Sequence, residues 1–256
     1  WFGGPGPHPM VDRHLRGPAP LYDNGVLIVP GENILIAVDP YNGSELWQRE
    51  LPSSQRYSMP YDAGYISMCR DRVAIAVNQT CQLMESSSGR LLREFHLPKS
   101  PKAHHWGYTL LLEEALLGSI QKDSASRTQP GYEQIDADYR NAQPLVTSQA
   151  LFRLDPETGQ MSWMYRHGVL INPTFAVSGA QIFFVESHSQ RARNNASGRV
   201  RLSTLLEGEA YLVSLSLESG KPLWKHRLPE SLLKCQNILY LMANLESLVA
   251  CGSFLN

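Results

Sequence analysis

The stretch Ala37–Trp47, AVDPYNGSELW, recurs along this chain of 256 residues and decides its architecture. It returns as RLDPETGQMSW at residues 153–163 and as SLSLESGKPLW at residues 214–224. A fourth, degenerate copy, LMESSSGRLLR at residues 83–93, keeps the glycine but has no tryptophan. Internal repetition of this kind predicts a repeat architecture, in which each copy belongs to one structural unit.

Each copy is typical of a strand, a tight turn and a second strand. Asp can accept hydrogen bonds from the turn amides, Pro fixes φ, and Gly suits the left-handed backbone position. In three copies tryptophan follows the glycine by four residues, a fixed offset that favours packing between repeats over a direct functional role. The residues assigned to this structural motif are Asp39, Gly43, Trp47, Gly89, Asp155, Gly159, Trp163, Gly220 and Trp224.

Other short apolar runs precede each turn, so each repeat contains about four strands. The second strands are expected at Val26–Val29, Val73–Val77, Leu116–Ile120 and Ile182–Val185. No segment shows sustained helical periodicity. Four short strands per repeat are typical of a β-propeller blade, so the predicted fold is all-β, with four-stranded antiparallel blades.

The spacing of the turn glycines locates the blades and two insertions. The intervals are 46, 70 and 61 residues, whereas a plain blade needs about 40–50. We expect blades at residues 17–52, 57–98, 106–166 and 169–228, part of a fifth at 236–256, and insertions at roughly 121–149 and 187–209. Because an incomplete blade leaves strand edges exposed, we expect the remaining blades of a seven- or eight-bladed ring from further sequence or another chain.

The pattern Ala-x-Asp-x-x-Thr-Gly-x-x-x-Trp, followed by the copies around Gly43, Gly159 and Gly220, resembles the tryptophan-docking repeat of quinoprotein-like (PQQ-like) β-propellers. That superfamily includes the pyrroloquinoline-quinone alcohol dehydrogenases and a non-catalytic outer-membrane assembly lipoprotein. The resemblance covers nearly the whole chain, is closer to the lipoprotein branch, and implies a periplasmic or cell-envelope location. The resemblance is informative about the fold but says little about function, because the motif serves to pack blades together.

Composition sets outer bounds on function. The chain is 43% hydrophobic and 18% charged, with a net charge of −1, so it can bury a substantial core and has no global charge footprint for nucleic acid. Its longest apolar stretch, Ile238–Phe254, is interrupted by Asn244 and Glu246, so no membrane-spanning segment is expected.

The cysteines form two close pairs along the chain, Cys69 with Cys81 and Cys235 with Cys251. Each pair could be a disulfide or two small buried thiols, and the spacing leaves both open. The pyrroloquinoline-quinone alcohol dehydrogenases have adjacent cysteines in a strained disulfide ring, which this sequence lacks.

Blade topology predicts where a ligand site would lie. Loops between successive blades and loops between second and third strands open on one face, which we call the loop face. The repeated glycine turns open on the opposite face, the turn face. Both insertions and five of the eight histidines belong to the loop face. The candidate ligand-binding residues, which we expect to converge at the mouth of the ring, are Asp12, Arg13, His14, Arg16, Arg56, His104, His105 and Trp106.

Simpler interpretations of these residues stay open. Asp12 and Arg13 could form a salt bridge, and His104 and His105 could be solvated loop residues. Adjacent histidines rarely chelate one ion and no carboxylate completes a set, so no metal site is predicted. The second insertion has Arg191, Arg193, Arg199 and Arg201, and the first has Glu133, Asp136 and Asp138. The insertions could pair with each other, or form a lid or a partner-docking surface.

The favoured functional hypothesis is a non-catalytic or ligand-binding propeller of the cell envelope. Its loop face would bind a protein, a glycan or a small acidic ligand, with Arg13, Arg16 and Arg56 available to pair with carboxylates. Two alternatives are a quinoprotein oxidoreductase, whose family members use pyrroloquinoline quinone with calcium, and a polysaccharide-active propeller enzyme using Arg and His residues. No calcium-site residues can be matched here, so no cofactor is predicted and catalytic residues are not assigned.

Overall fold

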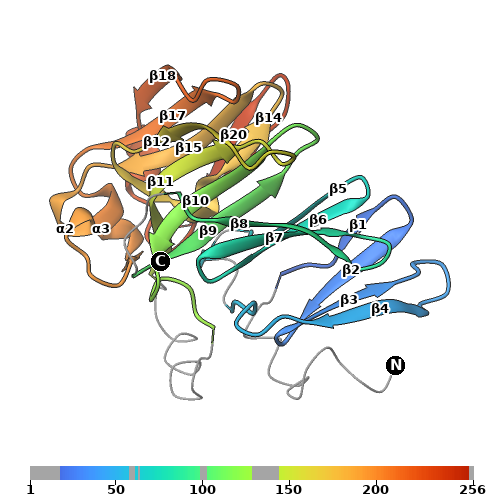
Figure 1. Cartoon of the computed structure of the whole chain (residues 1–256). Helices are drawn as coiled ribbons and strands as arrows, with labels where there is room; N and C mark the ends of the chain where they lie inside the picture. Colours follow the sequence, from blue (N-terminus) through green and yellow to red (C-terminus); the bar gives the residue numbers. More distant parts are fainter. Residues whose placement is uncertain (1–17, 58–60, 63, 99–102, 129–143, 254–256) are drawn as a thin grey trace.

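The structure, a computed structural model, describes residues 18–57, 61–62, 64–98, 103–128 and 144–253. The candidate residues Asp12, Arg13, His14 and Arg16 lie outside the described residues, as do the three acidic residues of the first insertion. Within the described ranges the chain is mostly strands, with only short helices. Figure 1 shows the strands grouped into successive twisted sheets.

The first two predicted blades are separate four-stranded sheets in which each strand pairs antiparallel with the next. The first contains β1 (Leu21–Asp23), β2 (Val26–Gly31), β3 (Ile34–Val38) and β4 (Glu45–Glu50). The second contains β5 (Ile66–Cys69), β6 (Arg72–Val77), β7 (Thr80–Glu85) and β8 (Leu91–His96). The second blade was expected from residue 57, but its first strand begins at Ile66, because the preceding segment pairs instead with the first insertion through Tyr57 and Arg127.

The third and fourth blades each have four strands in the expected order, yet they are joined into one sheet. The third contains β9 (His104–Leu111), β10 (Leu116–Lys122), β11 (Leu145–Leu154) and β12 (Met161–Tyr165). The fourth contains β14 (Ala176–Ser178), β15 (Gln181–Ser187), β17 (Ala210–Ser216) and β18 (Pro222–Arg227). Strand β13 (Val169–Ile171) pairs with both β11 and β15 and so bridges the two blades, which the sequence pattern did not predict.

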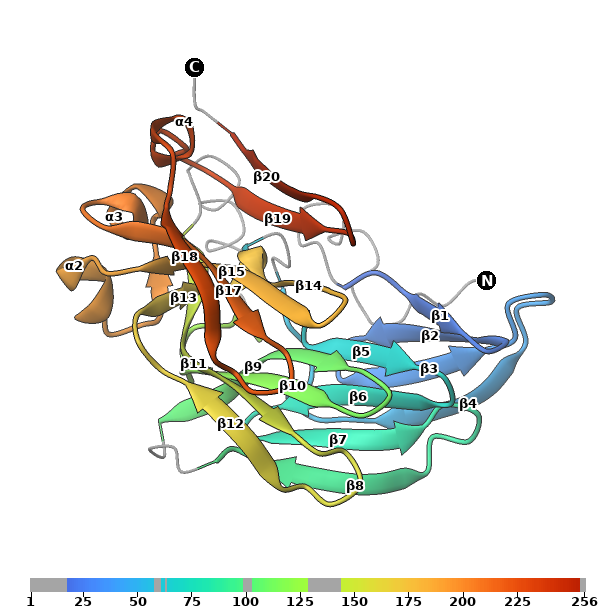
Figure 2. The ribbon, with the colours of Figure 1, turned by 90° about the horizontal axis from the view of Figure 1, so that it is seen from above.

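Part of a fifth blade follows. It is the hairpin of β19 (Leu239–Ala243) and β20 (Leu248–Gly252), which falls within the partial fifth blade expected at 236–256. Figure 2 shows the sheets arranged in chain order along an arc, with β1, β5, β14 and β19 toward the centre. Contacts of β5 with β1 and β9, and of β14 with β19, agree with this arrangement. The fold is therefore a propeller-like series of blades, and the sheets do not close into a ring within the described residues.

Burial changes across a blade from the arc centre outward. The second strand β6 is apolar and buried over Val73–Ala76, whereas the outer strand β8 is exposed at every residue except Phe95. The core consequently lies between neighbouring sheets, and the strand ends are left free to hold polar loops.

The repeated turn has the predicted hydrogen bonding. Gly43 N–H donates to the Asp39 carbonyl over 2.8 Å, and Gly159 N–H donates to the Asp155 carbonyl over 2.8 Å. The Asp155 carboxylate accepts hydrogen bonds from the Thr158 N–H and the Glu157 N–H. These bonds, with that from Thr158 the stronger cause, hold the pKa of Asp155 below its ordinary value. The glycine of the turn has a positive φ in all four copies, between 66° and 77°.

Tryptophan docking is confirmed at two interfaces. Trp47 Nε1 donates to the Ser86 carbonyl over 2.8 Å, and its ring lies on Gly89, in the turn of the next blade. Trp163 Nε1 donates to the Leu217 carbonyl over 3.0 Å, and its ring lies on Gly220 in the same way. Each tryptophan thus binds the turn of the following blade. The turn requires glycine for two reasons, because φ is positive and because a Cβ would clash with the tryptophan ring.

Trp47 is only half-buried despite its docking, and Trp224 also falls short of the burial expected between blades. Trp224 is half-buried and packs against Phe183 and His226. Both ring partners belong to strands of the fourth blade itself, β15 and β18. In the second blade Arg93 stands at the tryptophan offset, and Phe95 is the nearest side chain to Gly159.

Gly220→Ala is expected to destabilise the chain more than Gly208→Ala, by about 2 kcal/mol. Both glycines have positive φ, 66° and 87°, so both substitutions carry the backbone penalty. A Cβ at Gly220 would lie 2.4 Å from Trp163 Cδ2, whereas nothing lies within 4 Å of a Cβ at Gly208. Urea unfolding followed by circular dichroism measures the difference, and equal losses would mean that Trp163 does not dock on this turn.

All four cysteines are free thiols, which favours the interpretation as small side chains over disulfides. Burial raises the pKa of the Cys81 thiol, in the core of the second blade, and raises that of Cys235 as well. These thiols therefore stay protonated near neutral pH.

Candidate functional site

The loop face is assembled from segments that connect blades or interrupt them. The first insertion follows β10, and the second insertion, residues 188–209, lies between β15 and β17. The second contains α2 (Gln190–Arg193), β16 (Arg199–Val200) and α3 (Leu202–Leu206), and α4 (Glu230–Leu233) precedes the fifth blade. Figure 2 shows α2, α3 and α4 gathered at one end of β15, β17 and β18. The second insertion therefore lies on the predicted face, and the described start of the first insertion contacts it through Arg199 and the Ala125 carbonyl.

Arg56 lies in the connection between the first two blades and is buried against the start of the third. Its Nη1 donates to the Gly107 carbonyl over 2.9 Å and its Nη2 donates to the Trp106 carbonyl. The guanidinium also lies 5.0 Å from the centre of the Tyr65 ring. Burial lowers the pKa of Arg56, while the charge of Asp62 acts in the opposite direction. Arg56 is thus a fixed interior cation rather than a mobile loop side chain.

A chain of side-chain hydrogen bonds crosses the loop face from the second blade to the fourth. Ser126 Oγ donates to Asp62 Oδ2 over 2.5 Å, and Gln121 Nε2 donates to Ser126 Oγ over 2.6 Å. Asn172 Nδ2, at the start of the short 3-10 turn Asn172–Thr174, donates to Gln121 Oε1 over 3.2 Å. We call Asp62, Gln121, Ser126 and Asn172 the polar chain. It links two blade connections, at Asp62 and Asn172, through β10 and the start of the first insertion.

Two more arginines adjoin the polar chain. Arg199 Nη1 donates to the Ala125 carbonyl over 2.9 Å and Nη2 donates to the Pro144 carbonyl over 3.3 Å, so the second insertion is tied to the first. Burial lowers the pKa of Arg199, and Asp62 acts against this. Burial and the charge of Arg199 together lower the pKa of Arg127 to about 10. The arginine group Arg56, Arg127 and Arg199 therefore concentrates positive charge around the polar chain.

The described candidate residues have different outcomes. Arg56 and Trp106 are brought together, but through the Trp106 backbone. The expectation of a loop at residues 104–106 is wrong, because β9 begins at His104. The Trp106 side chain is fully buried and packs edge-on against Phe152 at 5.0 Å, so it cannot contact a ligand.

The two adjacent histidines belong to the same strand but differ in environment. His104 is buried, and its Nε2 lies 2.9 Å from Gln149 Oε1. His105 is half-buried, and burial and then the charge of Arg56 lower its pKa. His105 therefore stays close to the arginine group as a neutral side chain at neutral pH, and neither histidine is a solvated loop residue.

A second polar cluster lies where the third and fourth blades meet. The Glu186 side chain is completely buried, and its Oε1 accepts from Lys225 Nζ over 2.7 Å and contacts His188 Nε2. Tyr165 Oη donates to Glu186 Oε2 over 2.5 Å. Gly168 makes room for this side chain, because a Cβ there would lie 2.5 Å from Glu186 Cγ. We call Tyr165, Glu186, His188 and Lys225 the glutamate cluster.

Sequence reasoning missed the glutamate cluster and most of the polar chain. Asp62, Gln121 and Ser126 are isolated polar residues in separate segments, and nothing local marks them as partners. A signal did exist for Glu186, since it directly follows the apolar run Ile182–Val185 within one strand. A charged residue at such a position requires buried partners.

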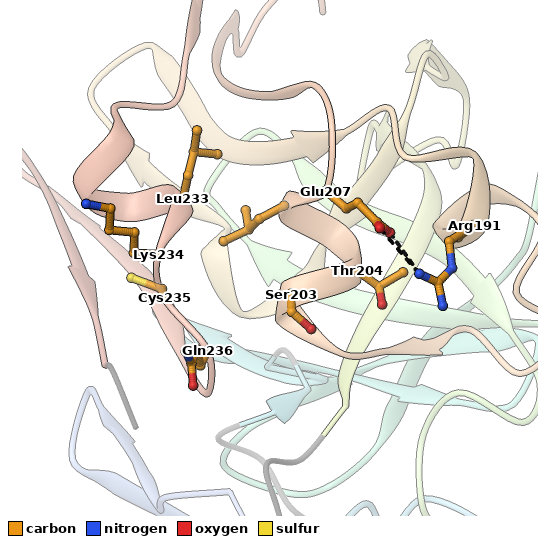
Figure 3. Close-up of a pocket in the computed structure, with 9 residues that line it drawn as sticks. Arg191, Ser203, Thr204, Glu207, Leu233, Lys234, Cys235 and Gln236 are labelled. Carbon is orange, nitrogen blue, oxygen red and sulfur yellow. Dashed lines mark hydrogen bonds and ion pairs between the residues drawn. The ribbon is translucent and has the colours of Figure 1, made fainter. Parts of the chain in front are cut away.

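The loop face also has a pocket with a cavity volume of about 410 Å³ (Figure 3). Its walls come from the second insertion and from α4 with the residues after it. The lining residues are Arg191, Ser203, Thr204, Leu206, Glu207, Leu233, Lys234, Cys235 and Gln236. Arg191 Nη1 and the Glu207 carboxylate form an ion pair at 3.2 Å on one side.

The surroundings of Asp62 do not favour a calcium ion at this carboxylate. Calcium requires six to eight oxygen ligands, mostly from carboxylates and carbonyls. Asp62 is the buried carboxylate of the polar chain, and its neighbours are Ser126 and the guanidinium groups of Arg56 and Arg199. These cations would repel a calcium ion, so we derive no chemistry through a calcium–quinone cofactor.

The comparison with known families agrees with this geometry. Residues 4–107 match the model of a family described as outer membrane protein assembly factor BamB. The chain carries PQQ-like propeller repeats. The matched region contains the first two copies of the turn and the first docking interface, between Trp47 and Gly89. No curated protein matches the sequence.

Solved structures support the fold of this PQQ-like propeller. A quinohemoprotein alcohol dehydrogenase from Pseudomonas putida HK5 is 11% identical, with a TM-score of 0.53, over 90% of this chain and 37% of that one. The Pan2 WD40 domain of Neurospora crassa is also 11% identical, with a TM-score of 0.51, over 89% of this chain and 54% of that one. The propeller thus spans about a third to a half of the length of these structures, and identities this low show the fold alone.

Proposed function

We propose that this PQQ-like propeller is a non-catalytic binding protein of the bacterial cell envelope whose loop face holds an acidic ligand. One observation carries the proposal, the arginine group that surrounds the polar chain. Arg56 is buried and held by backbone carbonyls, so it adds positive potential without contacting a ligand itself. Arg127 and Arg199 are half-buried and lie nearer to solvent, and Arg199 is also fixed by backbone carbonyls. Arg56 and Arg199 share the neighbouring carboxylate of Asp62, which leaves this region positively charged.

The distribution of surface charge between the two faces also supports binding of an acidic ligand at the loop face. Exposed arginines on the loop face include Arg166, Arg193 and Arg201. The loops of the turn face expose the acidic residues Glu113, Glu114, Glu157 and Glu218, and Arg70 and Arg90 there are in ion pairs with Glu113 and Glu85. Complementary potentials speed the encounter of partners and set their orientation, so an acidic ligand would approach the loop face.

The envelope location rests on the family match and remains part of the proposal. The match to the BamB family model covers residues 4–107. None of the helices among the described residues is long and apolar enough to cross a membrane. A rigid propeller with loops from several blades at one mouth is also a common way to present a binding surface.

The loop-face double substitution Arg127→Gln with Arg201→Gln is expected to weaken binding of poly-L-glutamate about tenfold. The matched control is Arg90→Gln with Lys221→Gln, which removes the same charge from the turn face and should leave affinity nearly unchanged. Calorimetry at two salt concentrations measures both variants, and the loss should shrink at high salt. Equal losses in the two double variants would show that only net charge matters and would contradict a loop-face site.

A sulfated glycan serves as a second probe in the same measurement. If dextran sulfate binds more tightly than poly-L-glutamate and shows the same dependence on Arg127 and Arg201, the loop face remains the site. The ligand class would then be a glycan rather than an acidic protein.

A further inference from the structure

The outermost strand of each complete blade has a β-bulge at the same place in the repeat. In β4, Leu46 lies between Glu45 and Trp47, which pair with consecutive residues of β3, so Leu46 has no opposite residue. The same shift of register leaves Leu92 in β8, Ser162 in β12 and Leu223 in β18 without an opposite residue. Each bulged residue follows the turn glycine by three positions. Because a bulge re-aims a side chain at the edge of a sheet, the repeat gives these side chains a common position.

Leucine occupies three of the four bulges and is exposed in each. Leu46, Leu92 and Leu223 are 47%, 40% and 52% exposed. In the third blade the bulged residue is Ser162, whose Oγ accepts a hydrogen bond from Arg153 Nη1 over 3.2 Å. The fold therefore does not require leucine at this position. Exposed leucines on the free edges of successive sheets favour association, so they point to a surface that a partner covers.

The turns beside the bulges are acidic. Among the described residues of the turn face, the exposed carboxylates without an ion pair are Glu45, Asp71, Glu114, Glu218 and Glu246. The exposed basic residues of the same turns are Arg70, Arg90 and Lys221, and only Lys221 has no ion pair. Figure 2 shows the turns between β3 and β4 and between β7 and β8 away from α2, α3 and α4. The turn face thus combines apolar side chains with negative charge, whereas the loop face has the arginine group.

We propose that the turn face docks a basic segment of a partner protein that also carries apolar side chains. The bulged leucines pack against its apolar side chains, and the unpaired carboxylates pair with its lysine or arginine side chains. Since the leucines belong to different blades, the segment lies across the arc rather than along one strand. This inference goes beyond the proposed function, because it concerns the opposite face and a ligand of opposite charge.

Two short synthetic peptides separate the apolar requirement from the charge requirement. One alternates lysine with leucine, and the other alternates lysine with serine. Fluorescence anisotropy with the whole chain should show the lysine–leucine peptide binding at least about tenfold more tightly than the lysine–serine peptide. Equal affinities would mean that the leucines of the turn face contact nothing.

The leucine variant combines Leu46→Ser, Leu92→Ser and Leu223→Ser. It introduces the residue that the third blade already has at this position, so its circular dichroism should match that of the unsubstituted chain. It should bind the lysine–leucine peptide at least about tenfold more weakly and leave the lysine–serine peptide unaffected. The matched control is Met242→Ser with Val249→Ser, which removes exposed apolar side chains from the β19–β20 hairpin and should leave both affinities nearly unchanged.

A second pair of variants tests the charge of the turn face. Glu114→Gln with Glu218→Gln should weaken binding of both peptides about fivefold, and the loss should shrink at high salt. The control is Asp123→Asn with Glu230→Gln, which removes the same charge from the loop face and should have little effect. Equal losses in these two variants would contradict a docking site on the turn face.

Two further results would overturn the proposal: equal losses in the leucine variant and the hairpin control, or no binding of the lysine–leucine peptide at millimolar concentration. Failure of the proposed function is distinguishable from these results, because Arg127→Gln with Arg201→Gln should weaken poly-L-glutamate binding without affecting the lysine–leucine peptide. If that variant leaves poly-L-glutamate binding intact while the leucine variant loses the lysine–leucine peptide, the arginine group is wrong and the turn-face site stands. The reverse pattern rejects the turn-face site alone.

Discussion

Trp163→Ala is expected to lower the free energy of unfolding by about 3–5 kcal/mol, the usual cost of deleting a large buried aromatic side chain. Trp163 is 9% exposed and packs in the cluster that joins the third and fourth blades. The substitution removes the ring from Gly220, leaves a cavity between two sheets and removes the hydrogen bond to the Leu217 carbonyl. Urea unfolding monitored by far-ultraviolet circular dichroism measures the loss.

Trp224→Ala is the matched control for this prediction. Trp224 occupies the same offset in its repeat but is only half-buried, and it packs on Phe183 and His226 of its own blade. Its truncation should therefore cost clearly less than that of Trp163. A loss for Trp163 no larger than for Trp224 would show that interblade docking does not stabilise the chain.

Lys225→Met is expected to destabilise the chain by about 3 kcal/mol, because it removes the cation that faces a buried carboxylate. Glu186 is fully buried, and it would keep only Tyr165 and His188 as partners. The Lys225 side chain is 32% exposed, so the methionine itself fits at the surface without overpacking the core. Chemical unfolding at neutral pH measures the loss.

The contribution of the glutamate cluster to stability should also depend on pH. Burial raises the pKa of Glu186, but hydrogen bonds from Lys225, Tyr165 and His188 outweigh burial, so the folded pKa lies below the ordinary value of 4.5. A depressed folded pKa stabilises the native state above the unfolded pKa, and the effect is lost as pH falls through the folded value. The stability difference between the unsubstituted chain and Lys225→Met should therefore shrink as pH falls below the ordinary value of 4.5.

The double variant Glu186→Gln with Lys225→Met distinguishes two causes of destabilisation. One is the loss of the Lys225 side chain, and the other is the buried Glu186 carboxylate left without its cation. It should be more stable than Lys225→Met alone, because no buried carboxylate remains. If both variants lose the same amount, the cost comes from packing of the lysine stem rather than from the charge of Glu186.

The blade repeat could be predicted from the sequence because its signals are local. A turn with Asp, Pro and Gly specifies its own hydrogen bonds, so the positive φ of Gly43 and Gly159 and the strands on either side follow directly. The docking of Trp163 on Gly220 was also predictable, since the repeat places both at fixed offsets. Burial was overestimated for Trp47 and Trp224, which are only half-buried.

The candidate site was harder to predict, since its contacts join segments far apart in the sequence. Gln121 and Asn172 are 51 residues apart and meet only after two blades have packed. Arg56 was expected in a loop at the mouth of the ring, whereas its burial and its carbonyl partners depend on β9 beginning at His104. The positions of polar residues along the sequence suggested the loop face as the place for a site. The hydrogen-bond partners of those residues could not be predicted, because they depend on how whole sheets pack.

Hydrogen–deuterium exchange with and without poly-L-glutamate tests the central claim, that the loop face binds acidic ligands, most directly. The account predicts slower exchange in residues 123–128 and in the second insertion, residues 188–209, when the ligand is bound. The glycine turns around Gly43, Gly89, Gly159 and Gly220 should exchange at unchanged rates. Protection confined to those turns, or no protection at a saturating ligand concentration, would contradict it.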